Sequence, residues 1–320
     1  MHKLKVLFHD NCFDGAASAA VFTRFYRERV RADVEVEYQG LSHQAGGEGI
    51  DPAAFSGDEN AVVDFRYSRS PGLTWWFDHH QSAFQQDGDE AHFRADRSGR
   101  KFHDPTRKSC TKYLADVCKA HFGFDPTPLR ELIEWADLID AARFSSPQEA
   151  VELAEPALEL MAVLEASKEP QLTRWIIEQM QTKPLEVIAA SARVQEALKP
   201  LRRRQREALE AVRARATFEG GVVFFDLTGT GFEGVNKFFS YFLFPEASYT
   251  VWVGQSGERP KISIGANPWR PQLRRHDLAR IAERYGGGGH AVVAGISFRE
   301  GEVERARQVA NNIAAELRDS

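Results

Sequence analysis

The 320-residue sequence has few of the features that mark a membrane-bound or secreted protein. It has no apolar run near the roughly 20 residues of a membrane-spanning helix, and its N-terminal segment lacks a signal-peptide pattern. Cysteine is scarce: Cys12, Cys110 and Cys118 are the whole set, with no CxxC spacing. This count predicts neither a disulfide framework nor a structural zinc site. We therefore expect a soluble, cytoplasmic protein with no membrane partner.

Positive charge is not in excess either. The chain carries 41 Lys and Arg against 46 Asp and Glu, a formal net charge of −5. A protein that holds long nucleic acid by backbone charge alone needs the opposite balance. The composition therefore argues against a long duplex as partner. Short anionic substrates stay open, because they need only a local basic patch.

The hydrophobic content of 42% is typical of a globular protein, and the length predicts two domains. In the first half, short apolar runs alternate with helical patterns. We expect strands at 4–8, 34–38, 61–64 and 74–77 and a helix at 16–30. This alternation predicts an α/β domain whose mostly parallel sheet is flanked by helices.

The pattern changes twice in the rest of the chain. Residues 81–105 are polar and rich in Gly and Asp, which predicts a surface loop, and 109–215 are almost wholly helical. A second, smaller α/β pattern follows, with strands expected at 222–227, 249–254, 261–265 and 292–298 and helices at 235–244, 276–285 and 300–317. We therefore expect domains at 1–190 and 217–320, a helical linker at 191–216, and an active site in the cleft.

Acidic and imidazole side chains follow three of the expected strands in the first half. Segments 9–15 and 78–80 follow the first and the last of them, and Asp64 is the last residue of the one between. Because the carboxyl ends of parallel strands meet at one sheet edge, we expect these groups to lie together. Carboxylates and imidazoles without a suitably spaced thiolate favour Mn²⁺ or a similar divalent ion, with zinc less natural.

Each group also has an ordinary structural interpretation. Asp14 can cap the following helix, and Asp64 can end a strand in a turn. A single His79 is more often a satisfied residue than a ligand. Each interpretation explains one group alone, whereas a metal site explains why all three fall at the same edge. A further acidic pair, Asp137 and Asp140, lies on or at the end of an expected helix.

Four segments, in order, resemble the motifs of the DHH phosphoesterase superfamily. They are HDNCFDG at 9–15, VVDF at 62–65, FDHH at 77–80 and ADLIDAARF at 136–144. The C-terminal part, with GGGGHAVVAGISF at 286–298, is similar to the glycine-rich substrate-binding domain of that family. The resemblance covers most of the chain and includes nanoRNase-like and 3′-phosphoadenosine phosphatase-like members.

The resemblance implies a two-metal hydrolase that uses Mn²⁺, with Mg²⁺ or Co²⁺ as other candidates. In it Asp64 would bridge the ions, Asp14 and His79 would bind one ion, and His9 would bind the other. Two divalent ions about 3.5–4 Å apart lower the pKa of a shared water and hold the phosphoryl oxygens for in-line attack. A carboxylate suits the bridging position because it has two oxygens.

Four more residues take roles by the same analogy. His80 would touch the phosphate without ligating, and Asp78 would orient a ligand. In the fourth motif we favour Asp140 as the metal ligand, because the following residues resemble the family pattern. A metal or partner role for Asp137 stays open.

The first motif departs from the family pattern. Many members have two Asp residues separated by one position, and here Asp14 stands alone with Phe13 beside it. The metal site served by this motif is therefore expected to be short of a carboxylate. Asp10, Asn11 or water would complete it, or it would be weakly occupied.

The glycine run in the second domain predicts a phosphate site. Missing Cβ atoms let backbone N–H groups approach a phosphate, and a histidine can add a side-chain hydrogen bond. A flexible turn is the ordinary alternative. The expected substrate-binding residues are His290, Gly288, Gly289, Ser263 and Arg274. Many relatives place an Arg where this chain has Gly265, so Arg270, Arg274 or Arg275 is expected to substitute.

We therefore expect a Mn²⁺-dependent phosphoesterase of small nucleotides: short single-stranded RNA, a linear dinucleotide or a 3′-phosphorylated adenosine nucleotide. A cyclic-dinucleotide phosphodiesterase and a polyphosphate hydrolase are alternatives within the same class. RecJ-type exonuclease action on long single strands is disfavoured by the acidic charge balance. An inactive nucleotide-binding module is the alternative from another class, because the first motif is altered. A homodimer stays open.

Overall fold

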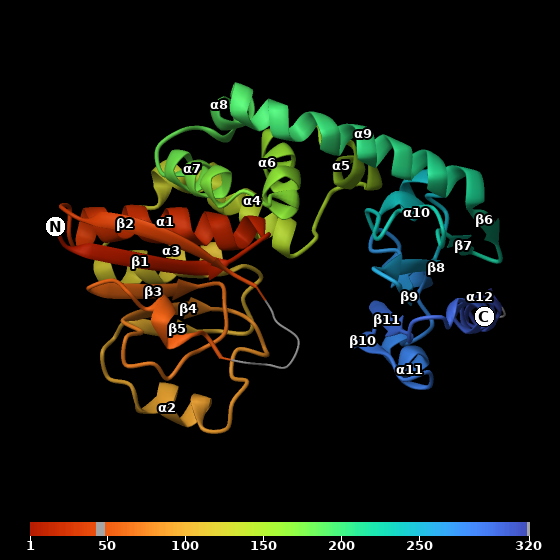
Figure 1. Cartoon of the computed structure of the whole chain (residues 1–320), viewed down its shortest axis with the longest axis horizontal. Helices are drawn as coiled ribbons and strands as arrows, with labels where there is room; N and C mark the ends of the chain where they lie inside the picture. The colour runs from red at the N-terminus through yellow and green to blue at the C-terminus, as the bar shows by residue number, and fades with distance from the viewer. Residues whose placement is uncertain (43–48, 319–320) are drawn as a thin grey trace. The chain divides into compact units, whose positions relative to one another are not determined.

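The computed structural model describes residues 1–42 and 49–318. The chain divides into two compact units, which we call unit 1 (residues 1–143 and 153–199) and unit 2 (residues 144–152 and 200–320). Each unit contains a β-sheet with flanking helices (Figure 1). The expected two-domain α/β fold class is confirmed. None of the helices in the described ranges is long and apolar enough to cross a membrane.

The sheet of unit 1 has five strands in the order β2-β1-β3-β4-β5, and all neighbouring strands are parallel. The strands are β1 (Lys3–His9), β2 (Glu35–Leu41), β3 (Glu59–Val63), β4 (Trp75–Asp78) and β5 (Lys101–His103). The three central strands, β1, β3 and β4, are mostly buried. This burial is expected of parallel strands covered on both faces.

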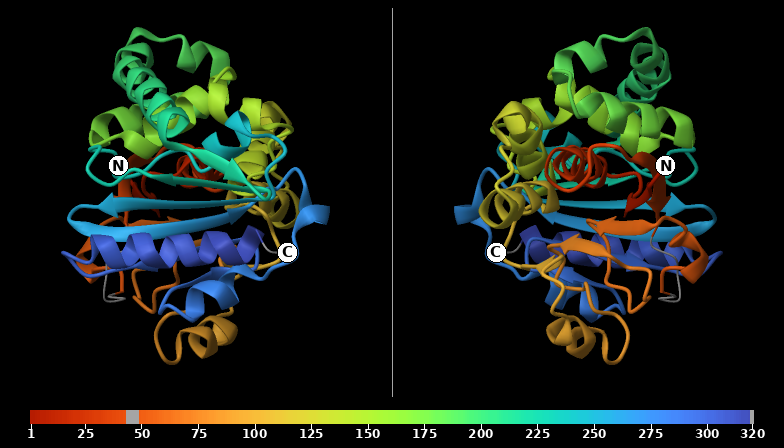
Figure 2. Two further views of the ribbon diagram at one scale, coloured as in Figure 1. Left: turned by 90° about the vertical axis from the view of Figure 1, so that its right-hand side faces the viewer. Right: turned by 90° about the vertical axis from the view of Figure 1, so that its left-hand side faces the viewer.

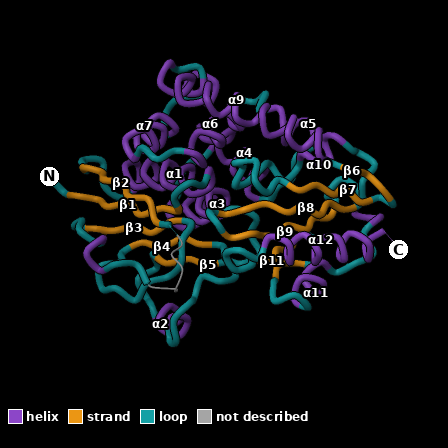
Figure 3. Tube along the Cα trace, turned by 45° about the vertical axis from the view of Figure 1, so that its right-hand side comes forward, coloured by secondary structure: helices purple, strands orange, loops and turns teal. Residues whose placement is uncertain are grey.

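Helices cover both faces of this sheet. The helical elements of unit 1 are α1 (Phe13–Arg29), η1 (Pro52–Ala54), α2 (Asp89–Ala95), α3 (Cys110–Phe122), η2 (Thr127–Leu129), α4 (Arg130–Asp140), α6 (Pro156–Ala166), α7 (Pro170–Met180) and α8 (Leu185–Ala189). Figure 3 shows α1 and α3 on one side of the sheet and α2 on the other. On the α2 side, Leu7, Val62 and Trp76 pack in a cluster with Phe93. These side chains form the hydrophobic core on the α2 face of the sheet.

The expected loop at 81–105 contains two short elements, α2 and β5, so that expectation was wrong in part. Each element buries an aromatic side chain against β4. Phe93 of α2 lies 5.2 Å from Trp76, and Phe102 of β5 stacks on Phe77 at 5.2 Å between ring centroids. Elements this short show no periodicity that could distinguish them from a polar loop.

Helix α9 (Ala192–Arg215) takes the place of the expected linker at 191–216, but the two units divide inside it, at Pro200, rather than near residue 216. Its first half buries Leu198 in unit 1, and its second half buries Val212 in unit 2. Gln205 also donates a hydrogen bond to the carbonyl of Val151, which precedes α9 but belongs to unit 2. The division therefore falls inside one continuous helix.

The sheet of unit 2 has six strands in the order β10-β11-β9-β8-β7-β6, and β7 with β8 is its parallel pair. The strands are β6 (Thr217–Glu219), β7 (Val222–Asp226), β8 (Tyr249–Ser256), β9 (Arg259–Ala266), β10 (Gly288–His290) and β11 (Val293–Ser297). The helical elements are α5 (Pro147–Glu152), α10 (Phe239–Leu243), η3 (Pro271–Leu273), α11 (Leu278–Glu283) and α12 (Val303–Arg318). Figure 2 shows α12 lying along the strands of this sheet.

Candidate metal centre

Adjacent strands deliver the candidate ligands to one edge of the unit 1 sheet. β1 ends at His9, and Asp64 directly follows β3. β4 ends at Asp78, immediately before His79 and His80. Because β3 pairs with both β1 and β4 in parallel, these residues come from the same end of neighbouring strands. The structure thus brings together what the strand-end pattern predicts to be close.

Asp64 has an uncommon backbone conformation. Its φ of 58° lies in the left-handed region, and its amide donates to the Phe77 carbonyl at 2.9 Å. The side chain is only 1% exposed. A non-glycine residue in this conformation costs on the order of 1 kcal/mol or more, and such residues cluster at functional sites. The turn after β3 therefore holds a buried carboxylate at the sheet edge.

Asp14 reaches the same edge from the first turn of α1. A Cβ on the neighbouring Gly15 would lie 2.1 Å from the His9 carbonyl oxygen, so glycine lets α1 begin against the end of β1. The N-cap of α1 is Cys12, and Asp14 does not cap the helix. Instead, its two carboxylate oxygens accept the amides of Cys110 at 2.7 Å and Thr111 at 3.1 Å.

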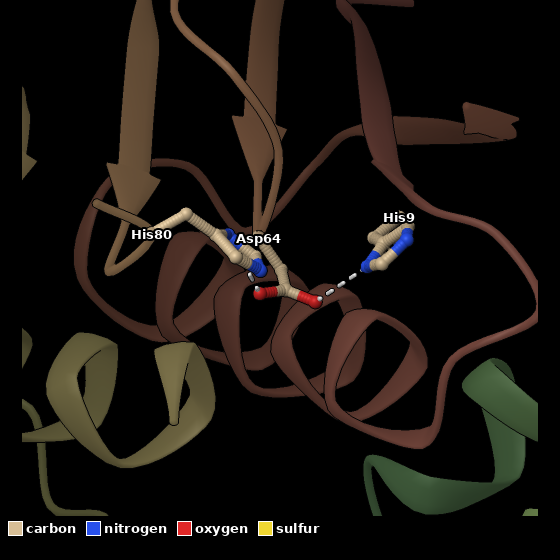
Figure 4. Close-up of side chains that lie close together, drawn as sticks. All are labelled: His9, Asp64 and His80. Atoms are coloured by element: carbon tan, nitrogen blue, oxygen red, sulfur yellow. Dashed lines mark ion pairs between the residues drawn. The ribbon is translucent and has the colours of Figure 1, made fainter. Parts of the chain in front are cut away.

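The candidate ligand atoms form two clusters. We call His9, Asp64 and His80 the His9 cluster, and Asp14, His79 and Asp140 the Asp14 cluster. Within each cluster, one ligand atom from each residue lies within 4.8 Å of the others. His9 and His80 flank the Asp64 carboxylate in Figure 4. This residue set offers imidazole nitrogen and carboxylate oxygen in both places.

The Asp64 carboxylate contacts both clusters, and its Oδ1 also lies 3.9 Å from His80 Nδ1 in the His9 cluster. Its Oδ2 lies 3.4 Å from His9 Nδ1, and its Oδ1 lies 3.4 Å from His79 Nε2. Asp140 Oδ2 is also 3.4 Å from His79 Nε2. Asp64 therefore lies between the His9 and Asp14 clusters and contacts residues of both.

The charges of the two clusters perturb one another. Burial alone would raise the pKa of Asp64, but the imidazoles of His79 and His9 outweigh it and lower the pKa to about 2. Burial and the Asp64 charge raise the pKa of Asp140 to about 6. For His79, burial opposes protonation, yet the surrounding carboxylates raise the pKa to about 10. Burial and the charges of Asp64 and Asp140 also raise the pKa of Asp14 well above its usual value.

Buried polar atoms test whether the residues suit a metal. Asp64 Oδ1 and His79 Nε2 are buried, and neither makes a hydrogen bond in the described structure. His79 Nδ1 lies 3.2 Å from the Arg107 carbonyl, to which it can donate, leaving Nε2 facing the carboxylates. An oriented imidazole and hard carboxylate oxygens are the ligands that Mn²⁺ and similar ions take. The site fits a divalent cation.

Asp78 and Asp137 lie outside both clusters. Asp78 Oδ1 accepts the His79 amide at 2.9 Å and His80 Nδ1 at 2.7 Å, so it orients the histidines that follow it. Asp137 is 6% exposed, and its carboxylate is taken by hydrogen bonds from other side chains. Of the fourth-motif pair, the structure places Asp140 with the candidate ligands.

No protein-family model matches the chain, and no curated protein matches it. Solved structures do. A pGpG-specific phosphodiesterase, PggH, of Vibrio cholerae is 17% identical with a TM-score of 0.71, covering 100% of this chain and 99% of that one. The DHH domain of a protein described as a member of a family of ribosomal proteins is 14% identical with a TM-score of 0.60, covering 98% and 86%. The chain has the DHH phosphoesterase fold.

RecJ from Thermus thermophilus, solved with Mn²⁺, shares the DHH fold at 15% identity and a TM-score of 0.55. The match covers 98% of this chain and 52% of RecJ. The resemblance inferred from the motifs is thus confirmed for the fold. Because the identities are low, the likeness carries the architecture rather than the role of any single side chain.

Within the DHH fold, Cys12 is the residue that the sequence reasoning missed. Two Asp separated by one position, with Asp14 as the second, would put the first at position 12. The structure places Cys12 Sγ 3.8 Å from Asp64 Oδ2. Burial, followed by the charges of Asp64 and Asp14, raises the pKa of this thiol well above its usual value. Asp10 and Asn11 lie in neither cluster, and spacing alone would have pointed to Cys12.

Restoring a carboxylate at this position should strengthen metal binding. The metal site served by the first motif is expected to bind Mn²⁺ more weakly than the other site. We expect Cys12→Asp to lower the Mn²⁺ dissociation constant of this weaker site by roughly tenfold, the scale on which residues around a metal tune its affinity. Titration calorimetry of the metal-free protein measures this change. Cys12→Ser, which adds an oxygen without a charge, is the matched control. Equal Mn²⁺ affinities for the two variants would show that position 12 does not serve the candidate metal centre.

The pKa of about 10 for His79 predicts proton release on metal binding. At pH 7 the metal-free protein holds this proton, and a metal must displace it to reach the imidazole nitrogen. Mn²⁺ affinity should therefore rise about tenfold per pH unit between pH 7 and 9, with about one proton released. Calorimetry in buffers of different ionisation enthalpy counts that proton. A binding enthalpy independent of buffer, or the same proton count in His79→Gln, would contradict the assignment.

Proposed function

We propose that this chain is a Mn²⁺-dependent phosphoesterase that hydrolyses small nucleotide substrates. The observation that carries the proposal is the position of Asp64, whose carboxylate contacts histidines of both ligand clusters. A carboxylate in this position can bridge two ions because it has two oxygens. Bound divalent ions would lower the pKa of a shared water and draw charge from the phosphoryl oxygens.

The surrounding residues hold this chemistry in place. Asp64 is fixed by its backbone turn, Asp14 by two amides of α3, and His79 by the Arg107 carbonyl. His80 remains partly exposed, with its Nδ1 held by Asp78 at 2.7 Å. Burial disfavours the charged form of His80, but Asp78 raises its pKa above the usual value. His80 is therefore suited to donate a hydrogen bond to a substrate phosphate, as the family analogy implies.

Unit 2 supports the choice of nucleotide substrates. Ser263 pairs with Gly295, which pairs with Gly288, so the three lie in one row across neighbouring strands. By strand alternation His290 faces the same side, opposite the face on which Ile264 packs with α11 and α12. This face combines a hydroxyl, an imidazole and a strip without side chains, which suits a phosphate and a sugar.

The glycine run serves two purposes. A Cβ at Gly289 would lie 2.4 Å from the Val293 carbonyl oxygen, and one at Gly287 would lie 2.3 Å from that of Gly295. These two glycines let β10 pair closely with β11. Gly288 has open space where a Cβ would stand, so it leaves the backbone accessible. Gly286 lies in a turn, whereas Gly288 and Gly289 belong to β10. We assign the phosphate contact to Gly288 and His290.

Three exposed arginines lie beyond β9 in unit 2. Arg270, Arg274 and Arg275 are exposed in the segment between β9 and α11. Buried Tyr249 anchors this segment, since its hydroxyl accepts the amides of Arg275 at 2.6 Å and His276 at 3.1 Å. We assign Arg274 to substrate binding. It would take the role of the arginine that many relatives have at the position of Gly265. A linear dinucleotide or a short single-stranded RNA is the substrate we favour, in line with the activity that the name of PggH states.

Asp64→Asn tests the reaction. The amide keeps the shape of the side chain but loses the charge between the clusters, so turnover of a linear dinucleotide should fall by more than a hundredfold, about 3 kcal/mol or more of transition-state stabilisation. Mononucleotide release in Mn²⁺ measures turnover, and circular dichroism checks the fold. Asp89→Asn, which changes a buried carboxylate outside both clusters, is the control. A folded Asp64→Asn protein that keeps a tenth of wild-type turnover would refute the proposal.

His290→Ala tests the nucleotide assignment. If His290 binds a phosphate away from the scissile bond, kcat/KM should fall at least tenfold for a dinucleotide and change little for a nitrophenyl phosphodiester, which lacks that phosphate. The control is Arg280→Ala, which removes an exposed cation on α11, on the opposite face of the sheet. Equal proportional losses on both substrates would contradict this role. Cyclic dinucleotides and polyphosphate in the same assay distinguish the alternative activities.

A further inference from the structure

Asp137 is a buried carboxylate that the proposed mechanism does not use. Its Oδ1 accepts the Ser109 hydroxyl at 3.2 Å, and its Oδ2 lies 3.3 Å from Lys112 Nζ. Arg143, just beyond the end of α4, donates a second charged hydrogen bond to Oδ2. One carboxylate thus joins residues at the start of α3 to the end of α4.

The start of α3 positions Asp14. Ser109 is the N-cap of α3, with its hydroxyl accepting the Lys112 amide at 3.3 Å. The next two amides, of Cys110 and Thr111, donate to the two oxygens of Asp14. Any shift of this first turn moves two of the donors that orient the Asp14 carboxylate.

The end of α4 positions Asp140. Asp140 is the last residue of α4 and lies one turn after Asp137. After it the chain turns through Ala142, which has a φ of 49°, and the Arg143 amide donates to the Leu138 carbonyl at 2.9 Å. This turn brings the Arg143 guanidinium into hydrogen-bond contact with the Asp137 carboxylate.

The Asp14 cluster needs such a fastening because its charges repel. Asp14 Oδ2 and Asp140 Oδ2 lie 3.8 and 3.4 Å from the same atom, His79 Nε2, and Asp64 Oδ1 lies 3.4 Å from it. Carboxylates this close disfavour one another's ionised form. Contacts that fix the two helix ends therefore help to keep these carboxylates together.

We propose that Asp137 is a positioning residue that fastens the start of α3 to the end of α4 and so keeps Asp14 and Asp140 at a spacing that one divalent ion can bridge. The proposal rests on the proposed function for the identity of the ion. Asp137 acts through Ser109 and α3 on one ligand and through α4 on the other. Lys112 and Arg143 neutralise its charge, so that the fastening does not add to the repulsion.

Asp137→Asn and Ser109→Ala each break one connection, and both are tested first without metal. In ¹H–¹⁵N NMR spectra, the Cys110 and Thr111 amides report their hydrogen bonds to Asp14, with Asp14→Asn as the reference for their loss. We expect both variants to move these two resonances toward that reference. Ser109→Thr, which retains the hydroxyl, should restore the wild-type positions.

Mn²⁺ affinity, measured by calorimetry, is the second readout. Asp137→Asn and Ser109→Ala should each weaken Mn²⁺ binding by about tenfold or more, and the double variant should lose little beyond either single one, because both break the same chain of contacts. The control is Asp277→Asn, which alters the carboxylate that caps α11 in unit 2 and lies 3.9 Å from Arg280. It should leave Mn²⁺ affinity unchanged.

Wild-type resonances for Cys110 and Thr111 in Asp137→Asn would overturn the proposal. So would a loss of Mn²⁺ affinity no greater than that of Asp277→Asn, because Asp137 would then contribute stability alone. A wild-type protein that binds no Mn²⁺ would instead refute the proposed function. In that case, the metal-free NMR comparison still decides whether Asp137 positions Asp14.

Discussion

The mutual repulsion of three neighbouring carboxylates is the constraint around which the candidate metal centre of unit 1 is built. Asp14, Asp64 and Asp140 converge on His79 Nε2 at 3.4 to 3.8 Å. Charges this close in a protein interior interact far more strongly than in water. The fold keeps them there with a protonated imidazole, two helix amides and a left-handed turn. Each device orients a carboxylate, and together they prepare the edge for a cation.

The carboxylates and histidines come together because they follow neighbouring parallel strands. A parallel sheet places successive strand ends side by side, so the motifs at 9–15, 62–65 and 77–80 meet without any long-range coincidence. The alternating pattern of strands and helices therefore sufficed to predict the fold of unit 1 and the edge where the candidate ligands lie. It was harder to predict which residue after β1 lies next to Asp64. The structure places Cys12 there, rather than Asp10 or Asn11.

The elements that sequence reasoning missed share a physical cause. α2 and β5 each rely on one aromatic side chain packed against β4, and so short a segment has no period to detect. The division of α9 at Pro200 depends on which unit buries each half of a continuous helix. A single amphipathic pattern cannot reveal two packing partners. Tertiary contacts, rather than local propensity, decided these features.

The glycine run shows how one sequence pattern can meet two requirements at once. Close pairing of β10 with β11 requires glycine at positions 287 and 289, where a Cβ would strike backbone oxygens. Position 288 meets no such obstacle, so packing does not explain its glycine. The proposed phosphate contact would account for it, because a glycine lets a ligand approach the backbone amide groups closely. Unlike Gly286, whose positive φ of 78° favours glycine, Gly288 has neither a packing nor a backbone reason in the structure.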